Sequence, residues 1–442
     1  MAFNFILINM NFCKQINAMK IIITFSLIIF FSNNILANKT DVVLTGFSIN
    51  AEYKDLERSA YYTNKLLNKY SGRQNIIDQT LQKEIRSNTF SYINILEDSS
   101  LISNETSKIA MSVFLDQELF EEFKLPEEDC KKIKITNCYI YNINNYFQII
   151  FFDFDKMTFL KAIPFQSIYI SDPSPKLNDD QIVNLFIKSY EDGKWLKDPA
   201  SNQVIQNNND TFISIMKEIK INEFYDFYIG VNPSAGGFIV NEEKIKNLIP
   251  SSFNNNLHLL KRQVANTFLG ELALKHNLVV VPYFEGVGVG NKIRGKYADQ
   301  SEAFLLQIPE PTYFIDFNLR GFVKQKFKKD AKVKGLTWYV YGAGINLRFY
   351  EPLMNKEYLN IKMTKADFKK IPDILTLNKT NEYINIINLT YKPLAIEFSN
   401  IINSDFKNNE DVEWLKKITK NQTKKKEILE FKKFLDKLAS VK

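Results

Sequence analysis

Histidine, cysteine, glycine and proline are all scarce in this chain of 442 residues, which has two His, three Cys, 15 Gly and 13 Pro. So few His and Cys leave little material for a zinc or haem site, and so little Gly and Pro exclude collagen-like and low-complexity architectures. With 45% hydrophobic residues, 36 Phe and 21 Tyr, the chain is too apolar and aromatic for a disordered polymer. We expect a folded protein of two to three domains, with no metal and no cofactor.

The net charge of +7 comes from the two ends of the chain rather than from its body. Residues 1–37 hold two Lys and no acid, and residues 405–442 hold eleven Lys against seven acids. Residues 38–404 are nearly neutral, with 44 basic against 43 acidic groups. A duplex-binding domain carries its basic excess on one face of the fold. The sequence therefore argues against a nucleic-acid partner.

The start of the chain has the three regions of a secretory signal peptide. Met19-Lys20 precedes the eleven-residue apolar run Ile21–Phe31, and the segment ends at Ala37. The run is shorter than the roughly 20 residues that span a bilayer, so an uncleaved anchor is the weaker alternative. No Cys follows the small-residue site, so the lipoprotein pattern is missing there. We expect residues 1–37 to be an upstream segment and signal peptide, and the protein to be exported, periplasmic or outer-envelope associated.

Export would place Cys130 and Cys138 in an oxidising compartment, where they could pair. The residues between them alternate as a half-buried strand does, and eight residues at about 3.3 Å each would separate the two Cα atoms by roughly 26 Å. A disulfide needs them within about 7 Å. Either the segment turns back and the two cysteines pair, or it is a strand with two separate thiols.

The mature chain divides at the Pro- and Asn-containing stretch between Asp192 and Asp210. We expect an N-terminal α+β domain over 38–195, a C-terminal α+β sandwich domain over 210–404 and a helical tail over 405–442. Apolar and polar residues alternate along the strands that begin at Tyr313 and Gly344. Such alternation is typical of antiparallel sheets with one face covered. The predicted fold class is therefore α+β, with two helix-backed, mainly antiparallel sheets.

The tail contains an amphipathic helix. Its apolar residues step by three and four positions, and several lysines lie elsewhere on the helical wheel. The apolar residues are Ile428, Phe431, Leu435 and Leu438, and the lysines include Lys424, Lys425, Lys426, Lys432 and Lys433. Docking back onto the domain is the simplest interpretation. A partner helix or an anionic membrane surface is the alternative.

A glycine-rich loop, Gly286–Gly290, follows a buried strand but lacks the spacing of a dinucleotide fingerprint or a P-loop. We interpret it as a flexible surface loop. If it binds an anionic group, Lys292, Arg294 and Lys296 would form its charged rim.

Residues for nucleophilic or acid–base catalysis are few. His258 and His276 lie five turns apart on one predicted helix, so they cannot share a metal site. Asp153 and Asp155 share a strand face, but their place beside a hairpin turn favours a turn role over acid–base chemistry. We therefore expect no catalytic residue.

The second half has a pattern of elements that resembles a known family. Val279–Pro282, Tyr313–Phe322 and Ile345–Phe349 take the places of three conserved strand elements in the sandwich domain shared by the curli-secretion channel protein and the lipoprotein activator of penicillin-binding proteins. The similarity covers roughly residues 254–365, and the lipidated Cys of that family is missing. The resemblance implies a non-catalytic envelope protein that contacts other envelope proteins.

The leading hypothesis is an exported binding or assembly factor that works through protein–protein contacts. Its candidate partner surface consists of Tyr283, Phe284, Tyr313, Trp338 and Tyr341.

Two alternatives remain open. One is an exported hydrolase that uses a pair of carboxylates, such as Asp153 or Glu285, which would lie about 5 to 10 Å apart in a deep pocket. The other is a membrane-surface protein that acts through the basic C-terminal tail.

Overall fold

The described residues of the computed structural model begin at Lys39, so the predicted signal peptide lies outside them. The described ranges are 39–50, 59–69, 75–97, 108–197, 211–222, 225–232, 236–250, 257–283, 292–298, 303–333, 335–373, 377, 379–407, 412–413, 415–416 and 424–440. No helix within these ranges is both long and apolar enough to cross a membrane. Helices and two sheets occur in separate runs of the chain, which confirms the predicted α+β class.

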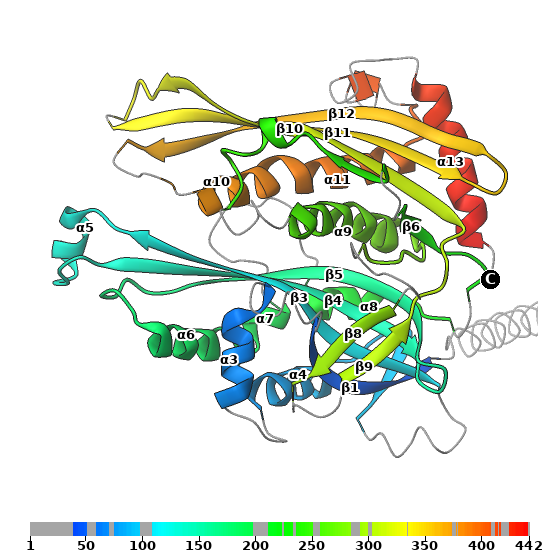
Figure 1. Ribbon diagram of the computed structural model, residues 1–442, viewed down its shortest axis with the longest axis horizontal. Helices are drawn as coiled ribbons and strands as arrows, with labels where there is room; N and C mark the ends of the chain where they lie inside the picture. The colour runs from blue at the N-terminus through cyan, green and yellow to red at the C-terminus, as the bar shows by residue number, and fades with distance from the viewer. Residues whose placement is uncertain are drawn as a thin grey trace, which may run out of the picture. The chain divides into compact units, whose positions relative to one another are not determined.

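The first sheet is built on an antiparallel meander (Figure 1). Its strands are β1 (Thr40–Asn50), β2 (Ile93–Leu96), β3 (Ile109–Lys124), β4 (Tyr139–Asp153), β5 (Thr158–Ile170), β8 (Lys292–Tyr297) and β9 (Ala303–Gln307). Strand β1 pairs in parallel with β3, and β3–β4–β5 run antiparallel to one another. The β8–β9 hairpin comes from the second half of the chain. Strand β9 of this hairpin pairs with β5, and strand β8 pairs with β1, so the sheet closes on itself.

Helices of the first half cover one face of this sheet. They are α3 (Tyr61–Lys69), α4 (Ile76–Arg86), α6 (Asp179–Glu191), α7 (Lys194–Lys197) and α8 (Phe212–Glu218). Helix α6 is capped by Asn178, whose side chain accepts from the backbone N–H of Gln181 in a capping box. The rings of Phe47, Phe147, Tyr190 and Trp195 pack together beneath the sheet.

The second sheet has the order β12-β11-β10-β6, with β7 also on β10. Its strands are β6 (Ile229–Val231), β7 (Phe238–Val240), β10 (Tyr313–Lys329), β11 (Leu336–Glu351) and β12 (Lys356–Pro372). The alternation predicted for β10 and β11 is observed, because Ile315, Phe317 and Leu319 are buried and their neighbours are more exposed. Helices α9 (Leu257–His276), α10 (Lys379–Ile386) and α11 (Lys392–Asn403) lie on its inner face.

The two halves repeat one topology. Each begins with a strand that pairs in parallel with the first strand of a three-stranded antiparallel meander. Helices follow the opening strand, α3 and α4 in the first half and α9 in the second, and a helix follows each meander. The isolated parallel bridge between Ile229 and Val280 occupies the position that β2 has beside β1. The chain therefore contains two structurally related units.

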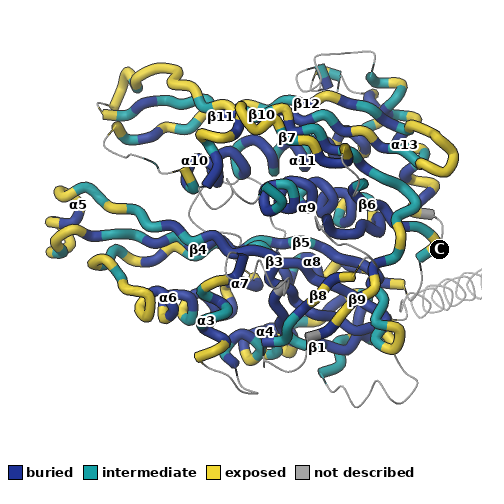
Figure 2. The backbone as a smooth tube through the Cα atoms, viewed as in Figure 1, coloured by how far each residue is buried: buried dark blue, intermediate teal, exposed yellow. Residues whose placement is uncertain are grey.

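The strands of the first sheet are not confined to the predicted N-terminal domain. Strands β8 and β9 belong to the first sheet, although they fall in the predicted C-terminal domain. Residues 198–210, which hold most of the predicted boundary, lie outside the described residues. Buried side chains from both halves form one continuous core, which Figure 2 shows as dark blue segments on neighbouring elements.

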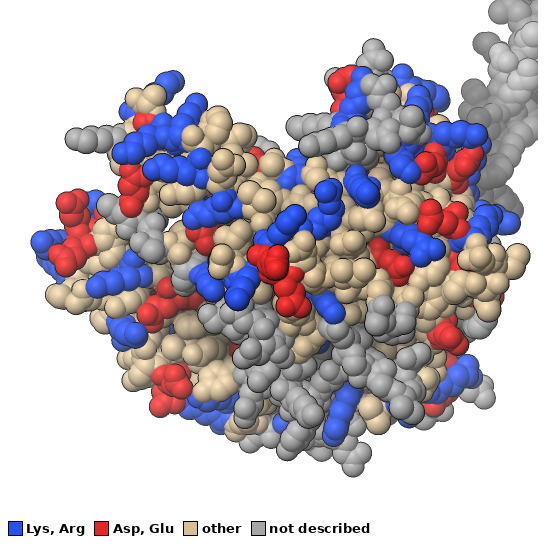
Figure 3. Space-filling view, turned by 45° about the horizontal axis from the view of Figure 1, so that its top comes forward, with Lys and Arg blue, Asp and Glu red and all other residues tan. Residues whose placement is uncertain are grey.

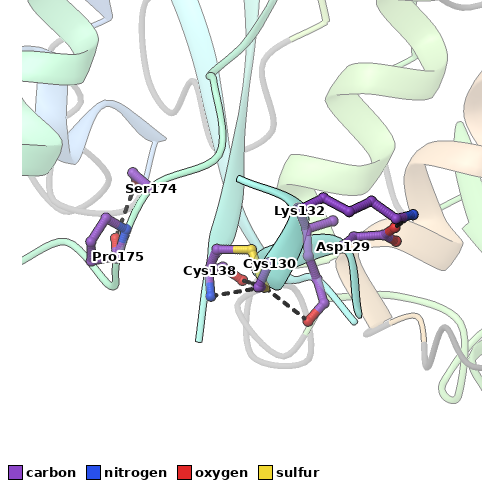
Figure 4. Close-up of a disulfide and its surroundings, with 7 residues drawn as sticks. Asp129, Cys130, Lys132, Cys138, Ser174 and Pro175 are labelled. Carbon is purple, nitrogen blue, oxygen red and sulfur yellow. Dashed lines mark hydrogen bonds and ion pairs between the residues drawn. A yellow bond between two sulfur atoms is a disulfide. The ribbon is translucent and has the colours of Figure 1, made fainter. Parts of the chain in front are cut away.

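Of the two alternatives for the segment between Cys130 and Cys138, the structure has the first: the segment turns back and the two cysteines form a disulfide (Figure 4). The segment is a short helix, α5 (Glu127–Lys132), followed by a turn in which Lys134 and Asn137 have positive φ. This turn brings the Cα atoms of the two cysteines to 5.5 Å. Alternation over five residues was too short a pattern to distinguish a strand from a compact turn.

The chain stays helical from α10 through Pro393 into α11. A π-helical turn, η4 (Ile387–Tyr391), joins α10 to α11, and Pro393 lies in the first turn of α11. Proline lacks the backbone N–H that a regular helix would use here, and the π turn directly before it is where the regular hydrogen-bond ladder is interrupted.

The amphipathic tail docks onto the domain. Helix α13 (Lys424–Ser440) contacts β12 and α11, and Ile428, Phe431, Leu435 and Leu438 are all buried. The ring of Phe434 stacks on Tyr358 with centroids 3.8 Å apart. Of the tail lysines, Lys424 pairs with Glu427, Lys425 and Lys432 donate to backbone carbonyls, Lys426 faces Glu430, and Lys433 is exposed. The apolar face of α13 is therefore packed against β12 and α11.

Candidate functional site

Tyr283 and Tyr341, two members of the predicted partner surface, are buried. Tyr341 points to the inner face of β11, where its hydroxyl donates to Glu382 Oε2 at 2.6 Å. Tyr283 stacks on Phe238 beside α9. Because both are buried, neither side chain offers surface to a partner. The sequence could not show this, since strand alternation predicts two faces but not which of them the helices cover.

The other predicted surface residues have three different placements. Tyr313 is half-buried and packs against Phe434 of α13. Phe284 lies outside the described residues. Trp338 is half-buried on the outer face of β11, opposite to the side of Tyr341.

The outer face of the second sheet carries an exposed apolar cluster around Trp338. Val323, Phe327 and Phe368 are 54%, 56% and 47% exposed, so no described element covers them. The Phe327 and Phe368 ring centroids are 5.2 Å apart, and those of Trp338 and Phe368 are 6.4 Å apart. We call these four residues the distal patch. Exposed apolar clusters of this kind mark interaction surfaces.

Local backbone geometry positions the distal patch. Phe327 is the extra residue in a bulge between Lys326 and Lys328, where the β10–β11 register shifts, and a bulge re-aims a side chain. Trp338 is held by its indole N–H, which donates to Asp330 Oδ2 at 3.0 Å. Asp330 Oδ1 also accepts from the backbone N–H groups of Lys332 and Val333 in the β10–β11 turn. The cluster is therefore built into the hairpin.

Lysines surround the distal patch. Lys370 Nζ lies 4.6 Å from the Trp338 ring centroid and Lys328 Nζ lies 5.5 Å from that of Phe327. Lys332 is exposed in the adjoining β10–β11 turn. Figure 3 shows lysine side chains interspersed with uncharged surface at this end of the sheet, in the upper left of the view. The surface suits a partner that brings apolar groups together with negative charge.

A shallow groove continues from the distal patch along the same face. It has a volume of about 670 Å³ and is lined by Val323, Val340, Gly342, Gly344 and Ala366, with Lys244 and Arg320 on its rim. The small residues create the depression. An ideal Cβ on Gly342 would lie 3.8 Å from the Cβ atoms of Val323 and Ala366. The groove can therefore accept side chains of an extended partner segment.

The predicted anion-binding residues lie on a strand rather than in a loop. Lys292, Arg294 and Lys296 alternate along β8, with Lys292 and Arg294 exposed. The glycines of Gly286–Gly290 lie outside the described residues.

Of the candidate carboxylate pair, only Asp153 lies within the described residues. Asp153 Oδ1 accepts from the backbone N–H of Lys156 at 2.9 Å, and its other oxygen lies 3.2 Å from Lys156 Nζ. This is the turn role favoured by the sequence. Glu285 lies outside the described residues.

One serine–histidine contact was not anticipated. His276 Nε2 lies 3.0 Å from Ser399 Oγ, which joins the end of α9 to α11. Burial lowers the pKa of His276 to about 4, so the ring is neutral at pH 7. Ser399 is 0% exposed, so a substrate cannot reach its hydroxyl, and the contact fastens two helices.

A second pocket is lined by polar side chains between β3–β5 and α9. Gln117, Tyr146, Gln148 and Gln263 line a cavity of about 70 Å³. This is room for about five water molecules, at roughly 10 to 15 Å³ each. The amide of Gln148 is buried with no hydrogen-bond partner among the described residues, and the cavity has room for the water that such a group needs but is too small for a substrate.

Comparison with known proteins adds little. No protein-family model and no curated protein matches the chain. One similar solved structure is described as a neuraminyllactose-binding hemagglutinin homolog from Helicobacter pylori, at 14% identity, covering 35% of this chain and 79% of that one, with a TM-score of 0.21. At that TM-score the similarity supports no conclusion.

Proposed function

We propose that this protein is an exported, non-catalytic envelope protein that acts as a binding or assembly factor through protein–protein contacts, with the distal patch as its contact surface. The observation that carries the proposal is the exposure of Val323, Phe327 and Phe368 on a sheet face that no described element covers. The resemblance of residues 254–365 to an envelope-protein superfamily supports the same role.

The partner that this surface fits is a protein segment with apolar side chains and several Asp or Glu residues. Burial of one aromatic side chain contributes about 1.5 to 3 kcal/mol, so Phe327 and Phe368 would act as anchors. The surrounding lysines would speed association with an acidic segment and weaken it in high salt.

Two alternatives have less support. The apolar face of α13 packs against the domain, so within the described residues this helix leaves no exposed apolar stripe with which to enter a membrane. The hydrolase alternative has less support because Asp153, one of its two named carboxylates, accepts a hydrogen bond from the backbone of Lys156 in a hairpin turn.

The test is crosslinked co-purification from an envelope-bearing bacterium, using the full chain with a C-terminal affinity handle. The patch variant is Phe327→Ser with Phe368→Ser. The matched control is Leu353→Ser with Met354→Ser, because those residues are 88% and 71% exposed in the β11–β12 turn. We expect one or two envelope proteins with the wild type and the control, at least tenfold less with the patch variant, and reduced recovery in high salt.

Equal recovery with the patch variant would remove the distal patch from the proposal, and recovery of no partner with any chain would refute the function itself. A third outcome is binding of the purified protein to vesicles of anionic lipid that depends on Phe327 and Phe368. That result would replace the protein partner with a membrane surface and overturn the proposal as stated.

A further inference from the structure

A lysine is buried in the first sheet, and its hydrogen-bond acceptor is a side-chain amide rather than a carboxylate. Lys161 lies on β5 and is 1% exposed. Its Nζ donates to the side-chain Oδ1 of Asn277 at 2.8 Å. Asn277 directly follows α9 and has a φ of 50°. A neutral amide oxygen can accept a hydrogen bond from an ammonium group but cannot neutralise its charge.

Lys161 lines a pocket large enough for a small molecule. The pocket has a volume of about 500 Å³, and its lining includes Lys161, Ser214, Glu218, Lys220 and Lys275. Small-molecule sites commonly have volumes of about 300 to 1,000 Å³. The charged groups of the lining are three lysines and one glutamate, so its net charge is positive.

Electrostatics favours an anion in this pocket. An ionised amine that has lost its hydration needs a counter-charge. Burial alone lowers the pKa of Lys161, to about 8. The carbonyl end of α9 supplies a partial negative charge of about half a unit, which compensates only part of the ammonium charge. Lys220 and Lys275 are exposed and would face an anion as it enters.

We propose that this pocket binds a small oxyanion, the carboxylate or phosphate group of a low-molecular-weight compound, with Lys161 as its buried counter-ion and Lys220 and Lys275 at its mouth. The site is separate from the distal patch and does not depend on the proposed binding partner. It also differs from the residues Lys292, Arg294 and Lys296 of β8, which the sequence suggested for an anion.

Equilibrium dialysis of the full chain tests this proposal, with radiolabelled inorganic phosphate and radiolabelled acetate as separate probes at constant ionic strength. We expect saturable binding of one anion per chain for at least one probe. Lys161→Met should weaken that binding at least tenfold, and Lys220→Gln with Lys275→Gln should weaken it several-fold. Lys433→Gln, an exposed lysine on α13, should leave it unchanged. The preferred probe identifies the ligand as a phosphate or a carboxylate compound.

Three outcomes would overturn the proposal. They are the lack of saturable binding of both probes, undiminished binding by a folded Lys161→Met variant, and equal weakening by Lys433→Gln. Circular dichroism establishes whether Lys161→Met is folded. If it is not, the double variant at the pocket mouth decides, because its side chains are exposed and their loss does not disturb the core.

Discussion

Two carboxyl groups on β3, those of Glu118 and Glu121, are buried and have shifted pKa values. Glu118 accepts from the backbone N–H of Thr63 at 3.0 Å and so supports the start of α3. Glu121, which accepts from Asn142 Nδ2 at 3.1 Å, faces the other side of the sheet. Burial raises the pKa of Glu118 to about 7 and that of Glu121 to about 8, although attraction to Lys369 opposes part of the second shift.

These raised pKa values predict a loss of stability as the pH rises. Between the ordinary glutamate pKa of about 4.3 and pH 8, the unfolded chain has released the Glu121 proton and the folded protein still holds it. The free energy of unfolding therefore falls with pH, by about 1.4 kcal/mol per pH unit for one proton. Glu121→Gln should remove this contribution, so its stability should fall less than that of the wild type.

The measurement is urea unfolding at pH 5, 6, 7 and 8. Glu128→Gln, which changes an exposed carboxylate on α5, is the control and should follow the wild type. A Glu121→Gln profile as steep as that of the wild type would show that Glu121 ionises normally in the folded protein.

At this scale the sequence predicts strand faces better than it predicts surfaces. Trp338 and Tyr341 were grouped as contact residues, but they lie on opposite faces of β11 and only Trp338 belongs to the distal patch. Phe327 and Phe368 were missed, although aromatic residues among lysines in VKQKFKK were a signal. Whether such a face is covered depends on helices distant in the sequence. Lys161 was similarly visible only as a lone charge in an apolar strand.

The packing of α9 on β5 depends on one glycine. An ideal Cβ on Gly270 would lie 2.2 Å from Pro164 Cγ, so helix and strand approach each other closely at this point. Any larger residue would have to push the two elements apart.

Gly270→Ala should therefore destabilise the protein. Overpacking costs about 1 to 3 kcal/mol, and the better helix propensity of alanine offsets up to about 1 kcal/mol of this. Gly342→Ala is the matched comparison, because its Cβ would meet neighbours only at 3.7 Å or more. Chemical denaturation of both variants should show a loss for Gly270→Ala and a change within about 0.5 kcal/mol for Gly342→Ala. Similar values for the two would contradict this account of the α9–β5 contact.

Elements with long periodic patterns could be predicted, and elements that depend on special backbone geometry could not. Helix α9 and the strands β10 and β11 follow from apolar spacing over many residues. The Cys130–Cys138 loop depends on positive φ at Lys134 and Asn137, which periodicity does not reveal. The continuous helix through Pro393 depends on a π turn before it.

At the scale of the whole molecule, the first sheet needs residues from the second half. Phe304 and Leu306 of β9 and Ile293 of β8 are buried with Phe114 and Phe152 in the core that the closed sheet surrounds. A chain that ends at residue 210 would leave this core open to water.

We therefore expect residues 38–210 expressed alone to lack a cooperative unfolding transition, whereas residues 38–442 should show one. Thermal circular dichroism and limited proteolysis would distinguish the two chains. A fragment that unfolds as sharply as the longer chain would establish the first half as an independent domain with the predicted range 38–195.

The strand order also determines when the first sheet can close during synthesis of the chain. The strands that flank the gap, β1 and β5, are complete once Ile170 has been made, yet β8 and β9 arrive only with residues 292–307. Throughout the synthesis of residues 171–291 the first half has an unclosed sheet and an unfilled interior. Because the interior of the first sheet can be filled only after Gln307 has been made, the first half is expected to complete its folding late in synthesis, together with the second half.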